Sequence, residues 1–279
     1  MSNAVAISAS DVNKLRQQTG AGMMDCKKAL TEAAGDFEVA IDLLRKKGQK
    51  IAANRQDREA KEGYVYGKVS ADGKYGVVVA VCSETDFVAK NADFIKYGES
   101  ILEAAMQTRP ASIDDLKNLK LGNQTIGETL IDQMGKIGEK IDVVDYQLVN
   151  AEKVIVYNHP GNKLTSMIGF NMVTPNIDEV GKDVAMQTAA MAPVAIDKDD
   201  VDSKIIEREI EIGKDLARQE GKPENMIEKI AMGKLNKFYN DYTLLNQVFI
   251  KDEKKTIRQY HEGVNKDLRV TVMKRVKIG

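Results

Sequence analysis

The side chains that most often carry covalent or metal chemistry are scarce in this sequence. Its 279 residues include two histidines, His159 and His261, and two cysteines, Cys26 and Cys82. A catalytic triad needs a base such as histidine beside its nucleophile, and a zinc site needs several ligands close together. The sequence therefore disfavours a hydrolase or a metalloenzyme, and we expect no catalytic residue, no metal and no cofactor. The two distant cysteines indicate a reduced protein without a disulfide framework.

Three short segments resemble nucleotide-binding motifs, and each lacks a required residue. The segment GNQTIGET at 122–129 has the spacing of a phosphate-binding loop, but Glu128 stands where a lysine must contact the phosphates. The run NKD at 265–267 places its aspartate one residue too early for a guanine-reading element. The run GAG at 20–22 is followed by Asp25 where a dinucleotide-binding fingerprint needs its third glycine. We therefore expect that the chain itself binds no nucleotide.

Charge and hydropathy limit the classes of partner. The 41 basic residues against 42 acidic residues give a net charge of −1, whereas proteins that grip phosphate backbones usually carry a basic surplus. The longest apolar run, at 75–82, is too short to span a membrane, and no apolar segment of a signal peptide precedes Ser8. We therefore expect a cytoplasmic protein that binds neither nucleic acid directly nor a membrane. Residues 2–4 are typical of a cloning remnant and are left out of the fold prediction.

The elements that must position any functional residue begin with three short helices over residues 8–50. Polar caps and glycine ends separate their apolar stripes. The residues expected at these caps and ends are Ser10, Gly20, Gly35, Asp36 and Gly48. A polar, charged stretch follows at 51–62 and is typical of a linker helix. A bundle of about forty residues buries little core, so we expect it to lean on another part of the chain.

The remaining chain alternates between strand and helix patterns, which favours an α+β fold. Strands at 64–69 and 75–81 flank Asp72-Gly73, a strong hairpin signal. The other expected elements are helices at 93–108, 125–138, 179–191 and 256–263, and strands at 142–149, 154–157, 166–173 and 268–278. Residues 202–242 carry two apolar helical stripes around a Gly-Lys-Pro break, which predicts an antiparallel helical hairpin, with two ordinary core helices as the alternative.

Two longer segments are more specific than any of these patterns. They read TGAGMMDCKKAL at 19–30 and TDFVAKN at 85–91, and in this order the chain closely resembles bacterial elongation factor Ts, the guanine-nucleotide exchange factor of elongation factor Tu. The resemblance extends through KIGE at 136–139 and covers nearly the whole chain. It implies a ubiquitin-associated-like three-helix domain at 8–50, a linker at 51–62 and two related α+β subdomains at 63–150 and 151–279. The hairpin at 202–242 emerges from the second subdomain.

The resemblance also implies a site at the segment Thr85, Asp86, Phe87 and Val88. In the family this loop enters the partner's GTPase domain, where the phenylalanine acts as a wedge between helices and the aspartate disturbs the network that holds magnesium. The residues alone permit a plainer interpretation. Thr85 or Asp86 would cap a turn, and Phe87 would pack in the local core, as an Asp-Phe pair recurs at 93–94.

Five further partner contacts are implied by the resemblance, namely Arg16, Met23, Met24, Ile137 and His159. Two adjacent helical residues cannot share one face, so at least one of the two methionines is expected to point outward. The alternative interpretation is that the methionines are core residues of the small bundle. A thioether suits an adaptable binding surface. A histidine before a proline is otherwise a structural turn residue. Cys26 and Cys82 lie in apolar patterns and are expected to be buried.

Together these observations predict a translation factor that binds elongation factor Tu carrying GDP and promotes GDP release without covalent chemistry. The complex is expected to be a heterodimer or a pair of heterodimers. Two other classes stay open. An adaptor would bind its target through the ubiquitin-associated-like domain without accelerating nucleotide release. A ribosomal RNA-binding protein would show salt-dependent RNA binding, which the balanced charge disfavours.

Overall fold

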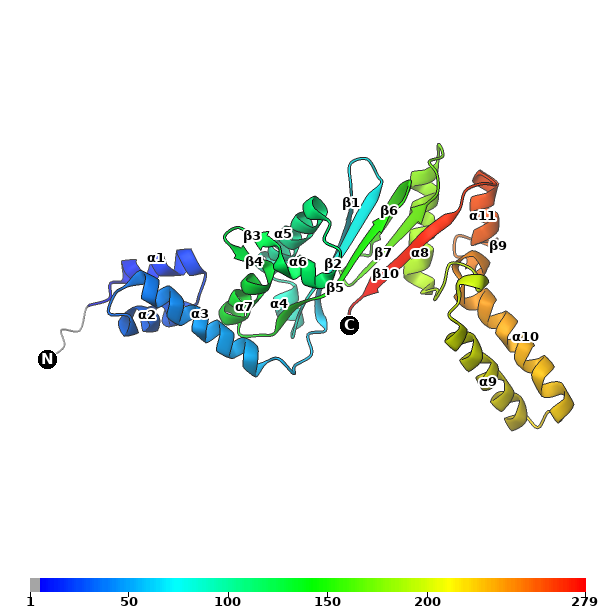
Figure 1. The fold of residues 1–279 in the computed structure, drawn as a ribbon, viewed down its shortest axis with the longest axis horizontal. Helices are drawn as coiled ribbons and strands as arrows, with labels where there is room; N and C mark the ends of the chain where they lie inside the picture. Colours follow the sequence, from blue (N-terminus) through cyan, green and yellow to red (C-terminus); the bar gives the residue numbers. More distant parts are fainter. Residues whose placement is uncertain (1–5) are drawn as a thin grey trace. The chain divides into compact units, whose positions relative to one another are not determined.

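The computed structural model describes residues 6–279, and residues 2–4 therefore lie outside the described part. The chain has the α+β composition predicted from its sequence, with helices first and a sheet-containing core after them (Figure 1). It forms two compact units. The first unit comprises residues 6–65, 79–146 and 278–279, and the second comprises Tyr66–Val78 and Gln147–Lys277. The predicted domain boundaries stay a prediction.

Three helices open the first unit, as predicted: α1 (Ala9–Thr19), α2 (Met23–Glu32) and α3 (Phe37–Asn54). The predicted cap at Ser10 is wrong, because the hydroxyl of Ser8 accepts the hydrogen bond from the Asp11 N–H at 3.1 Å and Ser10 lies inside α1. Asp36 caps α3 as expected, by accepting from the Val39 N–H at 3.1 Å. The core of this bundle is built from small and aliphatic side chains, namely Val12, Leu15, Ala21, Cys26, Ala29, Leu30, Ala33 and Ala40.

Helix α3 is longer than its sequence pattern indicates. The expected end at Gly48 is wrong, because α3 continues to Asn54, and the expected linker helix at 51–62 is replaced by turns and irregular backbone after Asn54. Gly48 is buried where α3 meets α7 (Ile126–Ile137). A Cβ atom added at Gly135 of α7 would lie 2.9 Å from the Gly48 Cα, so the two glycines permit a close backbone approach.

The first three-stranded sheet has the order β1-β2-β5 and contains the predicted hairpin. Its strands are β1 (Glu62–Val69), β2 (Tyr75–Ser83) and β5 (Ile141–Asn150). The hairpin turn carries Gly73 with a positive φ of 73°, which suits glycine. The other elements between β2 and β5 are α4 (Asp86–Ala89), α5 (Ala92–Thr108), α6 (Ile113–Asn118), β3 (Lys120–Leu121), β4 (Gln124–Thr125) and α7.

The second unit is built on an antiparallel sheet of order β10-β7-β6, with β6 (Lys153–Asn158), β7 (Leu164–Phe170) and β10 (Val270–Lys277). Helix α8 (Ile177–Met191) covers one face of it, and Ile168, Phe170, Val180 and Val184 belong to the core between them. The remaining short elements are η1 (Lys198–Asp200), η2 (Leu244–Asn246), β8 (Val248–Phe249), β9 (Asp252–Thr256) and α11 (Ile257–Val264).

The predicted helical hairpin is confirmed as α9 (Ser203–Gln219) and α10 (Glu224–Tyr242), joined at the Gly-Lys-Pro break. The buried residues of the pair are small or aliphatic, and both helices carry charged outer faces, which is the pattern of a two-helix spur. In Figure 1 the hairpin extends away from the β10-β7-β6 sheet of its own unit.

Candidate functional site

The Asp86-Phe87 pair lies on a one-turn helix that follows the buried end of β2. Helix α4 spans four residues, and Asn91 begins the next helix by accepting a hydrogen bond from the Asp93 N–H at 2.8 Å. Phe87 is 84% exposed, so the interpretation that it packs in the core is wrong. The second Asp-Phe pair behaves oppositely, because Phe94 is 3% exposed. Burial of a large apolar side chain is favourable, so contact of Phe87 with a partner would be stabilising.

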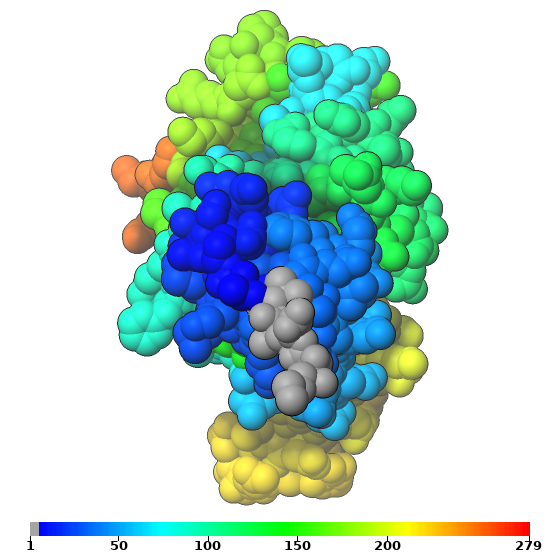
Figure 2. All heavy atoms as spheres, turned by 90° about the vertical axis from the view of Figure 1, so that its left-hand side faces the viewer, coloured from blue at the N-terminus to red at the C-terminus, as the bar shows by residue number. Residues whose placement is uncertain are grey.

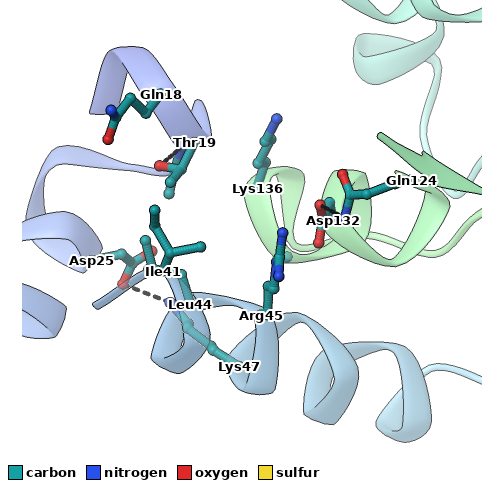
Figure 3. A pocket seen from close by; sticks show the side chains of 12 residues that line it. Gln18, Thr19, Asp25, Ile41, Leu44, Arg45, Lys47, Gln124, Asp132 and Lys136 are labelled. Carbon is teal, nitrogen blue, oxygen red and sulfur yellow. Dashed lines mark hydrogen bonds and ion pairs between the residues drawn. The ribbon is translucent and has the colours of Figure 1, made fainter. Parts of the chain in front are cut away.

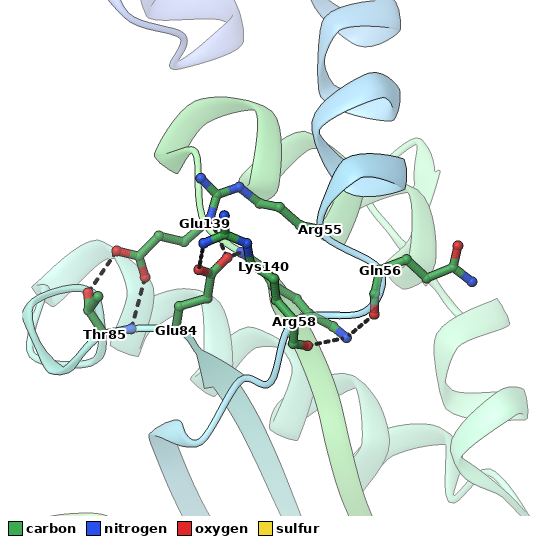
Figure 4. A network of polar contacts seen from close by, with 7 residues as sticks. All are labelled: Arg55, Gln56, Arg58, Glu84, Thr85, Glu139 and Lys140. Atoms are coloured by element: carbon green, nitrogen blue, oxygen red, sulfur yellow. Dashed lines mark hydrogen bonds and ion pairs between the residues drawn. The ribbon is translucent and has the colours of Figure 1, made fainter.

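Thr85 precedes α4 but does not cap it with its side chain. Its hydroxyl donates instead to Glu139 Oε1 at 2.7 Å, and its backbone N–H donates to Glu139 Oε2 at 3.0 Å (Figure 4). In the opposite direction, the backbone N–H of Lys140 donates to Glu84 Oε1 at 2.6 Å. Two adjacent residues after β2 thus exchange hydrogen bonds with two adjacent residues after α7. We call this group the carboxylate latch (Glu84, Thr85, Glu139 and Lys140).

Two arginines after α3 fix the Glu84 side of the carboxylate latch. Arg55 forms an ion pair with Glu84, and the Arg58 guanidinium donates to the other carboxylate oxygen at 3.1 Å (Figure 4). Burial raises the pKa of Glu84, but hydrogen bonds from the Lys140 N–H and from both arginines outweigh it and hold this pKa below its usual range. The Lys140 ammonium donates to the backbone carbonyls of Gln56 and Arg58 at 2.6 and 2.8 Å. The segment after α3 is therefore joined to Lys140 directly by these bonds as well as through Glu84.

Asp86 forms an ion pair with Lys90 one turn later, at 2.6 Å between Oδ2 and Nζ. The hydrogen bond and the charge of Asp86 raise the pKa of Lys90. Both side chains are open to solvent, and exposed ion pairs of this kind contribute little to stability. The ion pair with Lys90 therefore adds little to the stability of the turn. Val88, the last residue of the predicted loop, is half-buried.

Both methionines of the second helix point outward. Met23 is 52% exposed and Met24 is 76% exposed, which confirms that at least one faces solvent and excludes both from the bundle core. Arg16, on the neighbouring helix α1, is exposed as well. Figure 2 shows the surface formed by these N-terminal helices in blue. Roles of these three residues in partner binding stay predictions.

Ile137 and His159 lie in different units. Ile137 is the half-buried last residue of α7, two residues before Glu139, and so belongs to the surroundings of the carboxylate latch. His159 is exposed in the turn between β6 and β7 of the second unit, where its Nδ1 lies 3.1 Å from the Tyr157 hydroxyl. The latch residues Glu84 and Glu139 were not predicted as site residues. The sequence carried no local signal for their bonds, because the bonded residues lie 54 and 56 positions apart.

The segment that resembles a phosphate-binding loop has a structural explanation. It forms the β3–β4 turn and the start of α7, where Thr125 and Glu128 make a capping box. Glu128 Oε2 accepts from the Thr125 N–H at 2.7 Å, and the Glu128 N–H donates to the Thr125 hydroxyl at 3.1 Å. Glu128 therefore caps the start of α7 in the place where a phosphate-binding loop would carry its lysine.

A cavity of about 240 Å³ lies between the N-terminal bundle and α7 within the first unit (Figure 3). Its acidic side chains are engaged, since Asp25 pairs with Lys47 at 2.5 Å and Asp132 accepts from Gln124 at 2.9 Å. Within residues 6–279, no three His, Cys, Asp or Glu side chains gather closely enough to hold a metal ion. No helix in that range is long and apolar enough to cross a membrane.

Comparison with known proteins places these features in a family. A sequence model described as elongation factor TS matches residues 84–279. The elongation factor Ts of Cytophaga hutchinsonii is 54% identical over 274 residues, covering 98% of this chain and 99% of that protein. That of Amoebophilus asiaticus is 49% identical, covering 99% and 100%, and that of Porphyromonas gingivalis is 45% identical, covering 97% and 98%.

Proposed function

Because the chain belongs to the elongation factor Ts family, we propose that it binds elongation factor Tu carrying GDP and accelerates the release of that GDP. Family membership makes it an elongation factor of protein biosynthesis that acts with a partner translation factor. The observation that carries the proposal is the 84% exposure of Phe87 on a turn whose preceding residue, Thr85, is hydrogen-bonded to Glu139.

In this proposal Phe87 inserts between helices of the partner's GTPase domain. An aromatic anchor buried in an interface is often worth about 2–4 kcal/mol. Insertion of Phe87 costs little folding stability, because its ring makes no core contacts that insertion would break. Five further residues act as partner contacts, as the family resemblance implies, and all are exposed or half-buried: Arg16, Met23, Met24, Ile137 and His159.

Asp86 has the second role in the proposal. Its carboxylate leaves the weak ion pair with Lys90 and disturbs the groups that hold magnesium in the partner. Magnesium is among the largest charges near a bound diphosphate, so its displacement leaves the phosphates without their counter-charge. GDP then dissociates faster. The energy of binding the chain displaces magnesium from the partner, and no covalent bond forms or breaks.

Exchange of this kind couples two binding equilibria. If the chain weakens GDP binding to its partner by some factor, GDP weakens binding of the chain by the same factor. The nucleotide-free complex is then the tightest species, and added GDP or GTP dissociates it. Gel filtration of the complex with and without GDP checks this reciprocity.

Release of fluorescent GDP from elongation factor Tu, with the chain at catalytic amounts, tests the proposal. Acceleration with turnover supports exchange. A stable complex without acceleration would instead support an adaptor, and absence of a complex would reject the partner. Salt-dependent binding to RNA in a parallel titration would favour the RNA-binding alternative.

A further inference from the structure

We propose that Glu139 is a positioning residue for GDP release, because its carboxylate holds the turn that presents Phe87. The inference rests on the proposed exchange function and adds a residue to it. Glu139 lies 54 residues from Thr85 in the sequence and directly after the glycine that ends α7.

The turn needs an external support because its own helix is too short to be stable. Helix α4 has four residues, buries none of them and lacks a side-chain cap. Its first backbone bond, from the Ala89 N–H to the Thr85 carbonyl, is 3.3 Å long. Helices of one turn are not stable in water without tertiary contacts. Phe87 contributes no such contact, since it is exposed.

Glu139 supplies that support at the residue where the turn begins. Each of its carboxylate oxygens accepts one hydrogen bond from Thr85, one from the hydroxyl and one from the backbone N–H (Figure 4). Hydrogen bonds to a charged acceptor are stronger than those between neutral groups. Two bonds to different atoms of one residue also fix its orientation, and therefore the direction in which the chain enters α4.

The support is itself anchored. The neighbouring Lys140 N–H bonds to Glu84, and Glu84 is held by Arg55 and Arg58. Glu139 therefore extends from a segment whose backbone is bound to the end of β2. A carboxylate on a freely moving loop would transmit no orientation to Phe87, whereas this one connects the turn to the sheet.

The chain contains a matched control for this chemistry. Glu128 accepts from the backbone N–H and the hydroxyl of Thr125 at 2.7 and 3.1 Å, which is the same pair of donors on the same residue type. It lies at the opposite end of the same helix, α7. Glu128→Ala thus removes the same type of interaction without touching the Phe87 turn.

The experiment compares Glu139→Ala with Glu128→Ala in fluorescent GDP release at saturating concentrations of the chain. We expect the maximal release rate to fall about tenfold for Glu139→Ala, the factor for a lost charge-assisted hydrogen bond, and to stay at the wild-type value for Glu128→Ala. Amide hydrogen exchange of residues 85–90 in the free chain is expected to rise in Glu139→Ala alone. Glu139→Gln, which retains one acceptor, gives an intermediate rate and replaces the alanine variant if that one unfolds.

A mutant cycle with the Asp86→Ala/Phe87→Ala variant separates positioning from direct contact with the partner. If Glu139 acts through the turn that carries these two residues, adding Glu139→Ala to that variant slows GDP release no further. Additive losses, or a wild-type rate for Glu139→Ala, would overturn the inference while wild-type exchange still stood. Failure of the wild-type chain to accelerate release would reject the proposed function itself, so the two failures are distinguishable.

Discussion

Two Asp-Phe pairs, seven positions apart, have opposite fates in the first unit. Phe94 lies on the buried face of α5, whereas Phe87 lies on α4, which buries no residue. Asn91 caps α5, and Phe94 in the first turn of that helix is buried, whereas the one-turn helix α4 packs no side chain into the core. Because Phe87 makes no core contacts, its side chain adds little to stability and is accessible to a partner.

Alanine substitution of each phenylalanine tests this contrast. Phe94→Ala is expected to lower the free energy of unfolding by about 3–5 kcal/mol, because it empties a buried site. Phe87→Ala is expected to change it by less than about 0.5 kcal/mol, as is usual for exposed residues. Urea denaturation followed by circular dichroism measures both. A loss for Phe87→Ala as large as that for Phe94→Ala would show that its ring is packed.

The exposed methionines give a second prediction at this scale. Met24→Ala is expected to weaken binding to elongation factor Tu by about fivefold or more, the effect of losing an interface residue worth about 1 kcal/mol. The free energy of unfolding stays unchanged, since Met24 is exposed. Met226→Ala, an exposed methionine on α10, is the control. Calorimetric titration measures the affinity of each variant for elongation factor Tu. Equal affinities for Met24→Ala and wild type would show that Met24 does not contact the partner.

Sequence alone could indicate Phe87 only through the family resemblance, because the local pattern of both Asp-Phe pairs is the same. Whether each phenylalanine is buried depends on where α4 and α5 begin and on which side of each helix packs against the core. The carboxylate latch could not be predicted from the sequence, for a different reason. Its bonds join residues 54 and 56 positions apart, and no local periodicity reports such pairs.

At the scale of elements, the packing of α3 on α7 depends on two glycines. Sequence patterns gave Gly48 the role of a helix end, since glycine commonly occurs there. Its partner, Gly135, lies far along the chain, and only the packed structure shows that the missing side chains permit contact between the two backbones. Helix positions with caps nearby, such as α7 between Thr125 and Gly138, could be predicted closely because the signals are local.

Gly135→Ala is expected to destabilise the first unit by about 1–3 kcal/mol, because its Cβ would overlap the Gly48 backbone. Gly233→Ala in α10 is the control, because a Cβ there meets nothing within 4 Å. That control is expected to stabilise the chain by about 0.5–1 kcal/mol, the helix preference of alanine over glycine. Differential scanning calorimetry compares the two, and equal stabilities would mean that α3 and α7 tolerate separation.

At the scale of the whole molecule, stability is expected to depend on pH through His261 of α11. Its side chain is 1% exposed, and among the described residues neither ring nitrogen has a hydrogen-bond partner. Burial lowers the pKa of His261, Glu262 opposes this shift, and Arg258 and Arg269 add to it. The unfolded chain therefore binds a proton more readily than the folded chain, so stability is complete above the ordinary histidine pKa of about 6.5 and falls as pH drops below it.

Urea denaturation between pH 7.5 and pH 5 measures this dependence. His261→Leu removes the titrating group and keeps an apolar side chain at the buried site. We expect the wild-type midpoint to fall with decreasing pH more steeply than that of His261→Leu. Parallel curves for the two proteins would assign the acid sensitivity to other groups.

The overall class of the molecule could be predicted well, because strand and helix patterns, the Asp72-Gly73 turn and the Gly-Lys-Pro break are local signals. The division into two compact units could not, because it depends on which segments pack together after folding. The proposed partner comes from the family resemblance, because no pattern of burial or charge identifies it.

In the proposed function, the exposed Phe87 drives GDP release from elongation factor Tu. The most direct measurement is the maximal rate of GDP release from elongation factor Tu with wild type, Phe87→Ala and Val173→Ala, an exposed apolar residue of the second unit. We expect Phe87→Ala to reduce this rate by at least about tenfold, as for the loss of an interface anchor, and Val173→Ala to leave it unchanged. A wild-type rate for a folded Phe87→Ala protein would contradict the claim.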